Sequence, residues 1–374
     1  MDFRRIAKAK LPAPVFHYID GGADDEWSMR RNTDAFDGYE LLPTHLSDVS
    51  SIDTRTTLLG RAVDWPVMIA PTGASKLFHS DGEPAVARVA AKMNMPYALS
   101  TVGTTTIEDI AEIGEHPKVF QIYVFRDRGL TRRFVERCKS TGYDALCLTV
   151  DTPVAGNRER DNYYGMMATA KPALRSVPSM LRHPGWLYRA VVRKEMELVN
   201  ITQDEEASSF TDMSVKDFID SQFDRSLTWK DVEWLANEWN GPLIIKGVQT
   251  VADCRQAADA GATAVMLSNH GGRQLEAAPA PVDCVADVAD ALRDRLEIIC
   301  DGGVRRGTHI VKALALGAHA VSVGRAYLYP LAAGGEAGVE RGLLLLQEEL
   351  RRSLALLGCD SLSKLDGRYV RKVA

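Results

Sequence analysis

The sequence predicts an α/β protein with the (β/α)8 TIM-barrel architecture, preceded by a short N-terminal helical segment and carrying a long insert after the fourth strand. From residue 66 onward, short apolar segments alternate with longer helical patterns, eight times in all. This alternation over about 260 residues fits a closed barrel better than an open doubly wound sheet. Each apolar segment also runs into polar residues or glycine, as expected at the catalytic face of a barrel. We therefore expect one domain over residues 1–374, with the barrel at about 66–330.

Two helices are expected before the barrel. Residues 2–10 form a short amphipathic pattern that ends before Leu11-Pro12. A second helical pattern is broken by Gly21-Gly22, shortly after Tyr18. This break is expected to direct Tyr18 inward, although a tyrosine between apolar neighbours is more often simply packed.

The eight expected strands are short apolar runs, too short for helices. They cover residues 67–70, 97–100, 119–123, 145–150, 243–246, 264–268, 297–300 and 320–323. Helical patterns lie between most of them, at residues 83–95, 107–113, 130–141, 229–240, 251–260 and 307–316. Such short parallel strands joined by helices are typical of consecutive βα units.

The last two strand ends carry the strongest chemical signal, because barrels commonly bind phosphate at the loops after strands seven and eight. Asp301-Gly302-Gly303 with Arg305, and Gly324-Arg325, offer glycine amides and guanidinium groups that suit a phosphate. The other strand ends carry Pro71-Thr72-Gly73, Ser100, Gln121 with Tyr123, Thr149 with Asp151, Lys246, and residues 268–273. Neither a GxGxxG that opens the first helix nor a GxxxxGK[ST] is present, so neither a Rossmann site nor a P-loop is indicated.

A long insert separates the fourth and fifth strands, at about residues 160–228. This length is far beyond that of a usual loop. Between residues 166 and 194 the insert is basic and rich in apolar and aromatic side chains, with no acidic residue. Its basic residues are Lys171, Arg175, Arg182, Arg189, Arg193 and Lys194. A segment of this kind, here residues 166–198, can lie on an anionic membrane surface; the alternatives are a solvated lid and a subunit contact.

Composition excludes several other classes of protein. The net charge of -5 and the pI of about 6.0 argue against general nucleic-acid binding. Six scattered cysteines without a CxxC pair indicate reduced core residues and a cytoplasmic protein. The N-terminal residues lack the apolar region of a secretory signal, and no apolar run approaches the roughly 18 residues of a membrane-spanning helix. No metal site is expected.

One octapeptide, Ser-Asn-His-Gly-Gly-Arg-Gln-Leu at residues 268–275, follows a short apolar strand. Its two glycines permit an unusual turn or a close approach to a ligand. His270 is a candidate base, and Arg273 is suited to gripping an anion. Taken alone, His270 could equally well cap or fill a loop.

Three motifs in this barrel order resemble those of the FMN-dependent α-hydroxy-acid dehydrogenases and oxidases. They are Leu-Thr-Val-Asp-Thr-Pro at 148–153, the octapeptide at 268–275, and Asp-Gly-Gly-Val-Arg-Arg-Gly at 301–307. The family includes glycolate oxidase, lactate oxidase, L-lactate dehydrogenase and mandelate dehydrogenase, and the resemblance covers nearly the whole chain. The long basic insert is more similar to that of the membrane-associated lactate and mandelate dehydrogenases than to the shorter loop of glycolate oxidase.

The resemblance implies a catalytic and substrate-binding role for seven residues. His270 is expected to remove a proton from the substrate, and Asp151 to stabilise the imidazolium that forms. Arg158 and Arg273 would hold the substrate carboxylate through charge-assisted hydrogen bonds. Tyr18 would add a bond to the carboxylate, and Tyr123 one to the hydroxyl oxygen. Lys246 would neutralise the negative charge of the reduced flavin.

The resemblance also implies FMN as the cofactor. FMN fits better than FAD because only one phosphate cradle is visible. Pro71, Thr72 and Gly73 would lie near the ring, and Ser100, Gln121, Thr149, Lys246 and Ser268 would bond to the isoalloxazine or the ribityl chain. Asp301 would bind the ribityl hydroxyls, and the phosphate would rest on Gly303, Arg305, Gly324 and Arg325.

Three positions bear on the electron acceptor and the substrate. Gly73 stands where glycolate oxidase carries an alanine, which favours a quinone or another carrier over oxygen. Val102 and Ala155 stand where glycolate oxidase carries bulkier side chains. The wider pocket makes an aromatic or longer acid such as mandelate at least as plausible as lactate, although a methylene changes discrimination by only ~1–3 kcal/mol.

The predicted function is therefore oxidation of an L-2-hydroxy acid by an enzyme that is peripheral on the inner face of the cytoplasmic membrane and, as is common in the family, tetrameric. The alternatives are an oxidase that uses O2 and makes H2O2, a related FMN barrel that acts on another alcohol, an amine or a modified peptide, and a flavin-binding scaffold without activity. The seven functional side chains argue against the scaffold.

Overall fold

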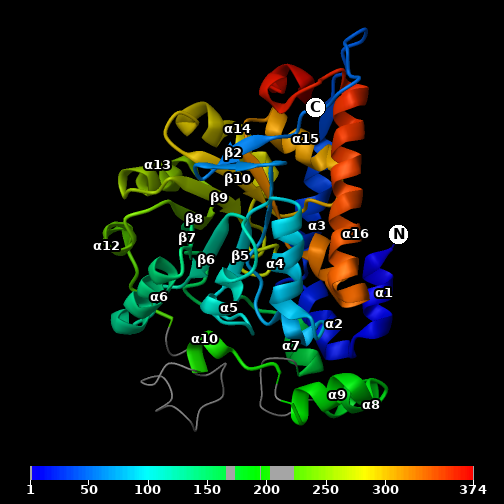
Figure 1. Cartoon of the computed structure of the whole chain (residues 1–374), viewed down its shortest axis with the longest axis vertical. Helices are drawn as coiled ribbons and strands as arrows, with labels where there is room; N and C mark the ends of the chain where they lie inside the picture. The colour runs from blue at the N-terminus through cyan, green and yellow to red at the C-terminus, as the bar shows by residue number, and fades with distance from the viewer. Residues whose placement is uncertain (1, 166–172, 194, 203–222, 374) are drawn as a thin grey trace.

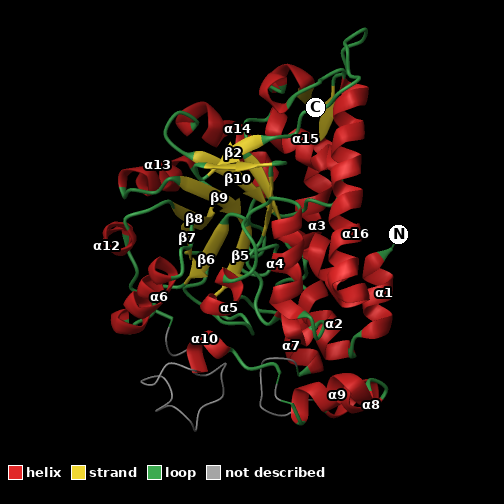
Figure 2. Cartoon of the chain, viewed as in Figure 1, coloured by secondary structure: helices red, strands yellow, loops and turns green. Residues whose placement is uncertain are grey.

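The computed structural model describes residues 2–165, 173–193, 195–202 and 223–373. Eight parallel strands form a closed barrel in the order β10-β11-β4-β5-β6-β7-β8-β9 (Figures 1 and 2). The strands are β4 (Val67–Ile69), β5 (Tyr97–Ser100), β6 (Lys118–Ile122), β7 (Ala145–Thr149), β8 (Leu243–Val248), β9 (Ala264–Ser268), β10 (Glu297–Asp301) and β11 (Ala320–Val323). The (β/α)8 barrel predicted from the sequence is confirmed.

Helices cover the outside of the barrel, and their apolar faces pack on the outward side chains of the strands. They are α4 (Gly82–Lys92), α5 (Ile107–Ala111), α6 (Arg128–Ser140), α12 (Trp229–Trp239), α13 (Val251–Asp259), α14 (Pro281–Leu292), α15 (Gly307–Ala315) and α16 (Arg325–Leu357). The helical patterns given above include neither α14 nor α16. Helix α16 runs along one side of the molecule (Figure 1). It contains Pro330 and bends at Gly334 and Gly335, where the backbone leaves helical geometry.

The N-terminal segment lies against the barrel and α16. It forms α1 (Phe3–Lys10), α2 (Ala13–Asp20) and α3 (Trp27–Asp34), and α2 ends immediately before Gly21 as predicted. Strand β1 (Tyr39–Leu41) pairs with β12 (Val370–Lys372) near the C-terminus. A hairpin of β2 (Thr56–Leu58) and β3 (Arg61–Val63) closes the end of the barrel where the strands begin, because Leu58, Leu59 and Val63 join the core inside the barrel.

The insert after β7 contributes four helices among the described residues. They are α7 (Glu159–Tyr164), α8 (Val177–Leu181), α9 (Pro184–Val191) and α10 (Val199–Thr202). All four gather at one end of the barrel, opposite the β2–β3 hairpin (Figure 1). The predicted basic residues Lys171 and Lys194 lie outside the described residues. Within the described part of the chain, no helix is long and apolar enough to cross a membrane.

The barrel interior changes from apolar to polar along the strands. The layers nearer the amino ends of the strands contain apolar side chains such as Ile244, Met266, Ile299 and Ala320. Because side chains alternate between the two faces of a strand, the residues two positions later also point inward. These form a polar layer, one residue from each of seven strands: Ser100, Gln121, Thr149, Lys246, Ser268, Asp301 and Ser322. The fold thus concentrates polar groups at the carboxyl end of the barrel.

Several predicted boundaries are wrong by one or two residues. The predicted end of the fifth strand at Lys246 is an example, because β8 continues to Val248. Its ladder with β9 contains an irregularity between Lys246 and Val248, and Gly247 has a φ of 103°. A Cβ at Gly247 would lie 2.7 Å from Asp151, so the bulge brings the two strand ends close together.

Candidate active site

A cavity of about 280 Å³ opens at the carboxyl ends of the barrel strands. Nearly all predicted site residues line it: Tyr18, Pro71, Thr72, Gly73, Ser100, Gln121, Tyr123, Thr149, Arg158, Lys246, His270, Arg273, Asp301, Gly303, Arg305, Gly324 and Arg325. The other two, Asp151 and Ser268, lie behind the wall and are hydrogen-bonded to lining residues. The structure therefore brings residues from all eight strand ends and from α2 into one site.

His270 and Asp151 form a partly buried pair. The His270 Nδ1 lies 2.9 Å from Asp151 Oδ1, so the carboxylate accepts the Nδ1 proton and leaves Nε2 as the basic nitrogen. Burial lowers the pKa of His270 below its usual 6.5, although Asp151 opposes this shift. Burial acts to raise the pKa of Asp151, but the neighbouring His270, which also donates a hydrogen bond to it, and the charge of Lys246 outweigh burial and hold that pKa below its usual value. At neutral pH the pair is an ionised carboxylate beside a neutral imidazole, as a general base requires.

The backbone at His270 is in the left-handed region. The φ angles of His270, Gly271 and Gly272 are 58°, 67° and 73°. This conformation is uncommon for histidine and is stabilised here by the bond from His270 N to Ser268 Oγ, at 3.0 Å. Gly272 is also required for space, because a Cβ there would lie 2.4 Å from Met29 N. The unusual turn predicted from the two glycines is confirmed.

Arg158, Arg273 and Tyr18, the three residues predicted to hold the substrate carboxylate and here called the carboxylate clamp, all line the cavity. The Arg273 guanidinium lies 5.0 Å from the centre of the Tyr18 ring and 3.9 Å from Asp161 Oδ2. Burial and the nearby Arg158 lower the pKa of Arg273 to about 10, so the side chain stays charged at neutral pH. Two guanidinium groups that face one small cavity create a strong site for an anion.

Tyr123 also lines the cavity. Burial and the charge of Asp151 raise the pKa of its hydroxyl to about 12, which keeps the hydroxyl protonated and able to donate a hydrogen bond. Its ring packs edge-on against Phe223, with ring centres 5.1 Å apart. Val102, Leu198 and Phe223 add apolar surface to the lining of the cavity.

Lys246 is the charged centre of the polar layer. Its Nζ donates to Ser268 Oγ at 3.1 Å and lies 3.5 Å from Asp301 Oδ2, and Ser268 Oγ donates to Asp301 at 2.7 Å. Burial acts to lower the pKa of Lys246, but Asp301 and Asp151 outweigh it and raise the pKa above its usual value. A fixed positive charge therefore lies in the lining of the cavity.

Two polar side chains in the polar layer have buried atoms with no hydrogen-bond partner. The Ser100 hydroxyl donates to Gln121 Oε1 at 2.9 Å, and Gln121 Nε2 is left without a partner. Ser322 Oγ is likewise buried and unpartnered. Both residues line the cavity. Because buried polar groups are normally hydrogen-bonded, these atoms fit a polar ligand that fills the cavity.

The predicted phosphate end carries two partly buried arginines, Arg305 and Arg325. Burial and Arg325 lower the pKa of Arg305 to about 10, and burial also lowers the pKa of Arg325. Arg325 donates to the carbonyls of Ile19, Gly271 and Gly21 at 2.8, 2.8 and 2.6 Å. Arg325 is thus a bridge between α2 and the His270 turn as well as a candidate phosphate ligand, since a guanidinium has five N–H donors.

Sequence reasoning missed two residues at this site. Gln274, in the octapeptide, donates to the carbonyls of Asp151 and Val154 and accepts from Gly156 N, so it ties two strand-end loops together. Ser322, the eighth strand's polar residue, lies two positions before Gly324. The signal available for Ser322 was its place in the strand, since every second residue of a barrel strand points inward.

Comparisons with known proteins agree with this arrangement. The model of the FMN-dependent dehydrogenase family matches residues 7–372. L-lactate dehydrogenase of Xanthomonas campestris pv. campestris is 38% identical over 376 residues, which cover 100% of this chain and 96% of the relative. Glycolate oxidase 1 of Zea mays is 38% identical over 370 residues, which cover 99% of this chain and 94% of the relative.

Solved structures give the same result. A crystal structure of the monotopic membrane protein (S)-mandelate dehydrogenase superposes with a TM-score of 0.92 at 36% identity and covers 99% of this chain and 98% of its own. A flavocytochrome b2 mutant with pyruvate bound superposes with a TM-score of 0.82 at 32% identity, over 99% of this chain and 85% of its own. This chain belongs to the FMN-dependent dehydrogenase family, and FMN is the cofactor of that family.

Proposed function

We propose that this protein oxidises an L-2-hydroxy acid to the 2-oxo acid and passes the two electrons through FMN to a quinone or another carrier. One observation carries the proposal. The neutral imidazole of His270, held by Asp151, faces the same cavity as the carboxylate clamp of Arg158, Arg273 and Tyr18. In a 2-hydroxy acid the carboxylate is bonded directly to the carbon that is oxidised. The carboxylate can therefore bind the clamp while the reacting carbon lies next to His270.

The protein's own groups have distinct tasks in this reaction. The clamp binds and orients the carboxylate, and Tyr123 donates a hydrogen bond to the substrate hydroxyl oxygen. His270 Nε2 accepts a proton from the substrate, and Asp151 stabilises the resulting imidazolium. FMN, when bound, accepts the two electrons and thereby supplies the redox chemistry.

The polar layer fits the flavin. Gln121 Nε2 and Ser322 Oγ are buried groups without partners on the cavity wall, and both can bond to a flavin or its ribityl chain. We assign Ser322 to the cofactor site together with the seven predicted flavin and ribityl contacts, Pro71, Thr72, Gly73, Ser100, Gln121, Thr149 and Ser268. Lys246 would neutralise the negative charge of the reduced flavin ring, and Asp301 would accept hydrogen bonds from the ribityl hydroxyls. The phosphate would be bound by Gly303, Arg305, Gly324 and Arg325.

The acid is proposed to carry an aromatic or long side chain. Val102 and Ala155 line the cavity together with the apolar side chains of Leu198 and Phe223, and glycolate oxidase is expected to carry bulkier side chains at the first two positions. Mandelate suits such a lining at least as well as lactate. The structural relative named (S)-mandelate dehydrogenase supports the same choice.

Gly73 stands where glycolate oxidase carries an alanine, and this difference favours an acceptor other than oxygen. A Cβ at this position would lie 2.6 Å from Val102 Cγ2 and 3.2 Å from Val102 O. The glycine therefore permits close packing of the two strand-end loops beside the predicted flavin ring. An oxidase that reduces O2 to H2O2 is the alternative.

The insert helices are proposed to contact an anionic membrane surface. Leu181 on α8, with Tyr188, Val191 and Val192 on and beside α9, are exposed by 55% or more of their surface. Helix α9 is also attached to the rest of the protein, because Trp186 Nε1 donates a hydrogen bond to Leu77 O at 2.8 Å. Exposed apolar side chains among arginines suit the membrane interface. A peripheral position on the inner face of the cytoplasmic membrane and a homotetrameric assembly remain predictions.

Product analysis under two conditions tests the function. Purified protein would be incubated with L-mandelate and a soluble quinone analogue under argon, and separately in air without the quinone. We expect one 2-oxo acid formed per quinone reduced, and much slower turnover in air. Stoichiometric H2O2 at a similar rate would instead identify an oxidase, and no 2-oxo acid from any of several L-2-hydroxy acids would contradict the proposal.

A further inference from the structure

The last turn of α2 is held by the arginines that face the cavity. The final carbonyls of a helix have no partner within the helix. Here Arg273 Nη1 donates to Tyr18 O at 2.5 Å and to Gly21 O at 3.0 Å, and Arg325 donates to Ile19 O and Gly21 O. The geometry of this turn therefore determines where the Arg273 guanidinium lies.

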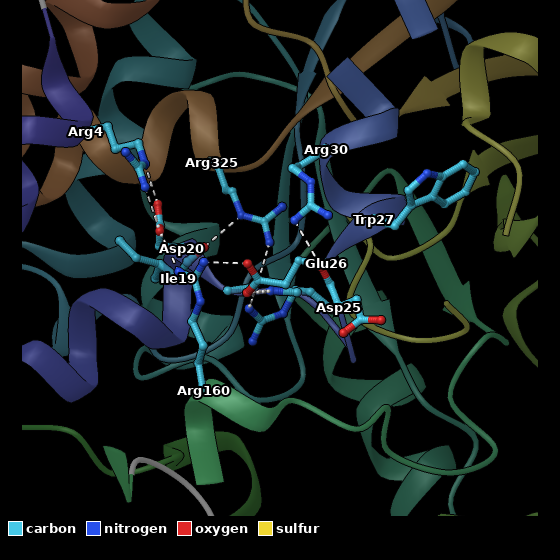
Figure 3. A network of polar contacts seen from close by, with 12 residues as sticks. Arg4, Ile19, Asp20, Asp25, Glu26, Trp27, Arg30, Arg160 and Arg325 are labelled. Carbon is cyan, nitrogen blue, oxygen red and sulfur yellow. Dashed lines mark hydrogen bonds and ion pairs between the residues drawn. The ribbon is translucent and has the colours of Figure 1, made fainter. Parts of the chain in front are cut away.

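The side chain of Asp20 fixes the same turn from the other side (Figure 3). Arg4 donates to its two oxygens from Nε at 2.6 Å and from Nη2 at 2.9 Å. Arg160 Nη1 donates at 2.9 Å and the Tyr329 hydroxyl at 2.8 Å. These partners come from α1, α7 and α16, so one carboxylate connects three elements to α2.

Asp20 is almost fully buried, with 4% of its surface exposed. Burial acts to raise its pKa, but the hydrogen bonds from Arg4, Tyr329 and Arg160 outweigh it and lower the pKa to about 2. The group is therefore ionised at any pH at which an enzyme of this kind works. A neutral side chain of the same shape would remove the negative charge that pairs with Arg4 and Arg160 and would weaken their hydrogen bonds to this position.

Arg160 extends the network to the segment that carries Arg158. It also pairs with Glu26, whose Oε1 accepts from Gly22 N at 3.0 Å. Arg160 thus binds Asp20 and Glu26, which lie at the two ends of the loop after α2. Arg160 is only two residues from Arg158 in the chain. Figure 3 shows Asp20, Glu26, Arg160 and Arg325 converging on this loop.

The α16 partners link this turn to the phosphate end of the cavity. Arg325 and Tyr329 are four residues apart, so they lie on the same face of α16. One contacts the carbonyls of the α2 turn and the other contacts the Asp20 carboxylate. Displacement of this turn would move the Tyr18 ring and the Arg273 guanidinium together.

We propose that Asp20 is a positioning residue that holds Tyr18, Arg273 and Arg158 in register as one carboxylate clamp. This inference rests on the proposed function, because it presupposes that the clamp binds the substrate carboxylate. Asp20 itself lies outside the cavity wall and acts through α2 and Arg160.

The test compares three single variants of the full-length holoenzyme. D20N should raise KM for the L-2-hydroxy acid about tenfold or more, with kcat changed less than about threefold and FMN content unchanged. Y329F removes one hydrogen bond to the same carboxylate, and we expect a smaller rise in KM, about two- to fivefold. D144N is the control, because it also removes a carboxylate from an arginine pair, with Arg61, at the opposite end of the barrel.

The possible outcomes are distinct. A raised KM in D20N and Y329F with a normal KM in D144N supports the positioning role. A normal KM in both D20N and Y329F overturns it, and so does an equal rise in D144N, which would indicate general loosening. If D20N does not fold with FMN, Y329F decides alone. If the wild-type protein oxidises no 2-hydroxy acid, it is the proposed function that fails.

Discussion

His270 Nδ1 lies 2.9 Å from Asp151 Oδ1, and the two residues come from the ends of strands that are separated by more than a hundred residues of chain. The pair fixes the tautomer of the imidazole and directs its free nitrogen to the cavity. The reaction proposed here depends on that nitrogen more than on any other single atom of the chain.

The variant H270Q should keep FMN bound and lose the reaction. Glutamine retains hydrogen-bonding capacity but cannot act as a base at neutral pH, so flavin reduction should slow by at least about 10³-fold. Stopped-flow absorbance under anaerobic conditions measures the rate, and the flavin spectrum before mixing measures cofactor content. Wild-type reduction rates in H270Q would refute the assignment of His270 as the base.

The plot of kcat/KM against pH should fall on its acidic side, because His270 becomes protonated there. The neutral imidazole is the active form, and burial lowers its pKa below 6.5, so kcat/KM should rise with pH and level off below neutrality. Asp151 favours the protonated form, so D151N should move this fall to lower pH while it reduces the plateau at least about 10²-fold. A fall that moves to higher pH in D151N would contradict this electrostatic account.

The variant S322A should weaken FMN binding. Loss of one hydrogen bond costs about 1 kcal/mol, which corresponds to a roughly fivefold higher Kd. Quenching of flavin fluorescence on titration into apoprotein gives the Kd without any turnover. S28A is the matched control, because Ser28 is also buried with an unpartnered hydroxyl but does not line the cavity. An unchanged Kd in S322A would remove Ser322 from the cofactor site.

The variant A155L should change which acid is preferred. A larger side chain at this position fills the space proposed for the substrate side chain, at a cost of ~1–3 kcal/mol for a bulky acid. The ratio of kcat/KM for mandelate to that for lactate should fall about tenfold or more. If both acids lose equally, Ala155 does not face the substrate side chain.

Membrane binding is predicted to depend on the insert helices. The double variant L181S/V192S should sediment much less with vesicles that contain phosphatidylglycerol, because it removes exposed apolar surface from the insert. The control L46S/L356S changes two exposed leucines elsewhere on the surface and should sediment like the wild type. Equal sedimentation of both variants would rule out the insert as the contact.

Local patterns predicted the barrel well because each βα unit carries its own signal. Short apolar runs such as residues 264–268 became strands with unchanged bounds. Helix α16 was missed because Pro330 and the Gly334-Gly335 pair interrupt its pattern, and packing against α1 and α4 stabilises it instead. Helix propensity alone does not contain that information.

The site was predictable to the extent that strand ends converge in a barrel. That rule alone predicts that His270, Asp151 and Lys246, which follow or end three different strands, lie close together. It could not predict the role of Asp20, whose partners Arg4, Arg160 and Tyr329 come from distant segments that pack only in the folded chain. It also missed Ser322, because a lone serine in an apolar strand resembles an ordinary core residue.

The most direct test of the account is anaerobic mixing of the holoenzyme with L-lactate, glycolate and each enantiomer of mandelate, with the flavin absorbance near ~450 nm as the readout. The account predicts rapid bleaching by an L-acid, fastest with the L enantiomer of mandelate and much slower with its mirror image. A yellow protein that none of these acids bleaches would contradict the proposed substrate class.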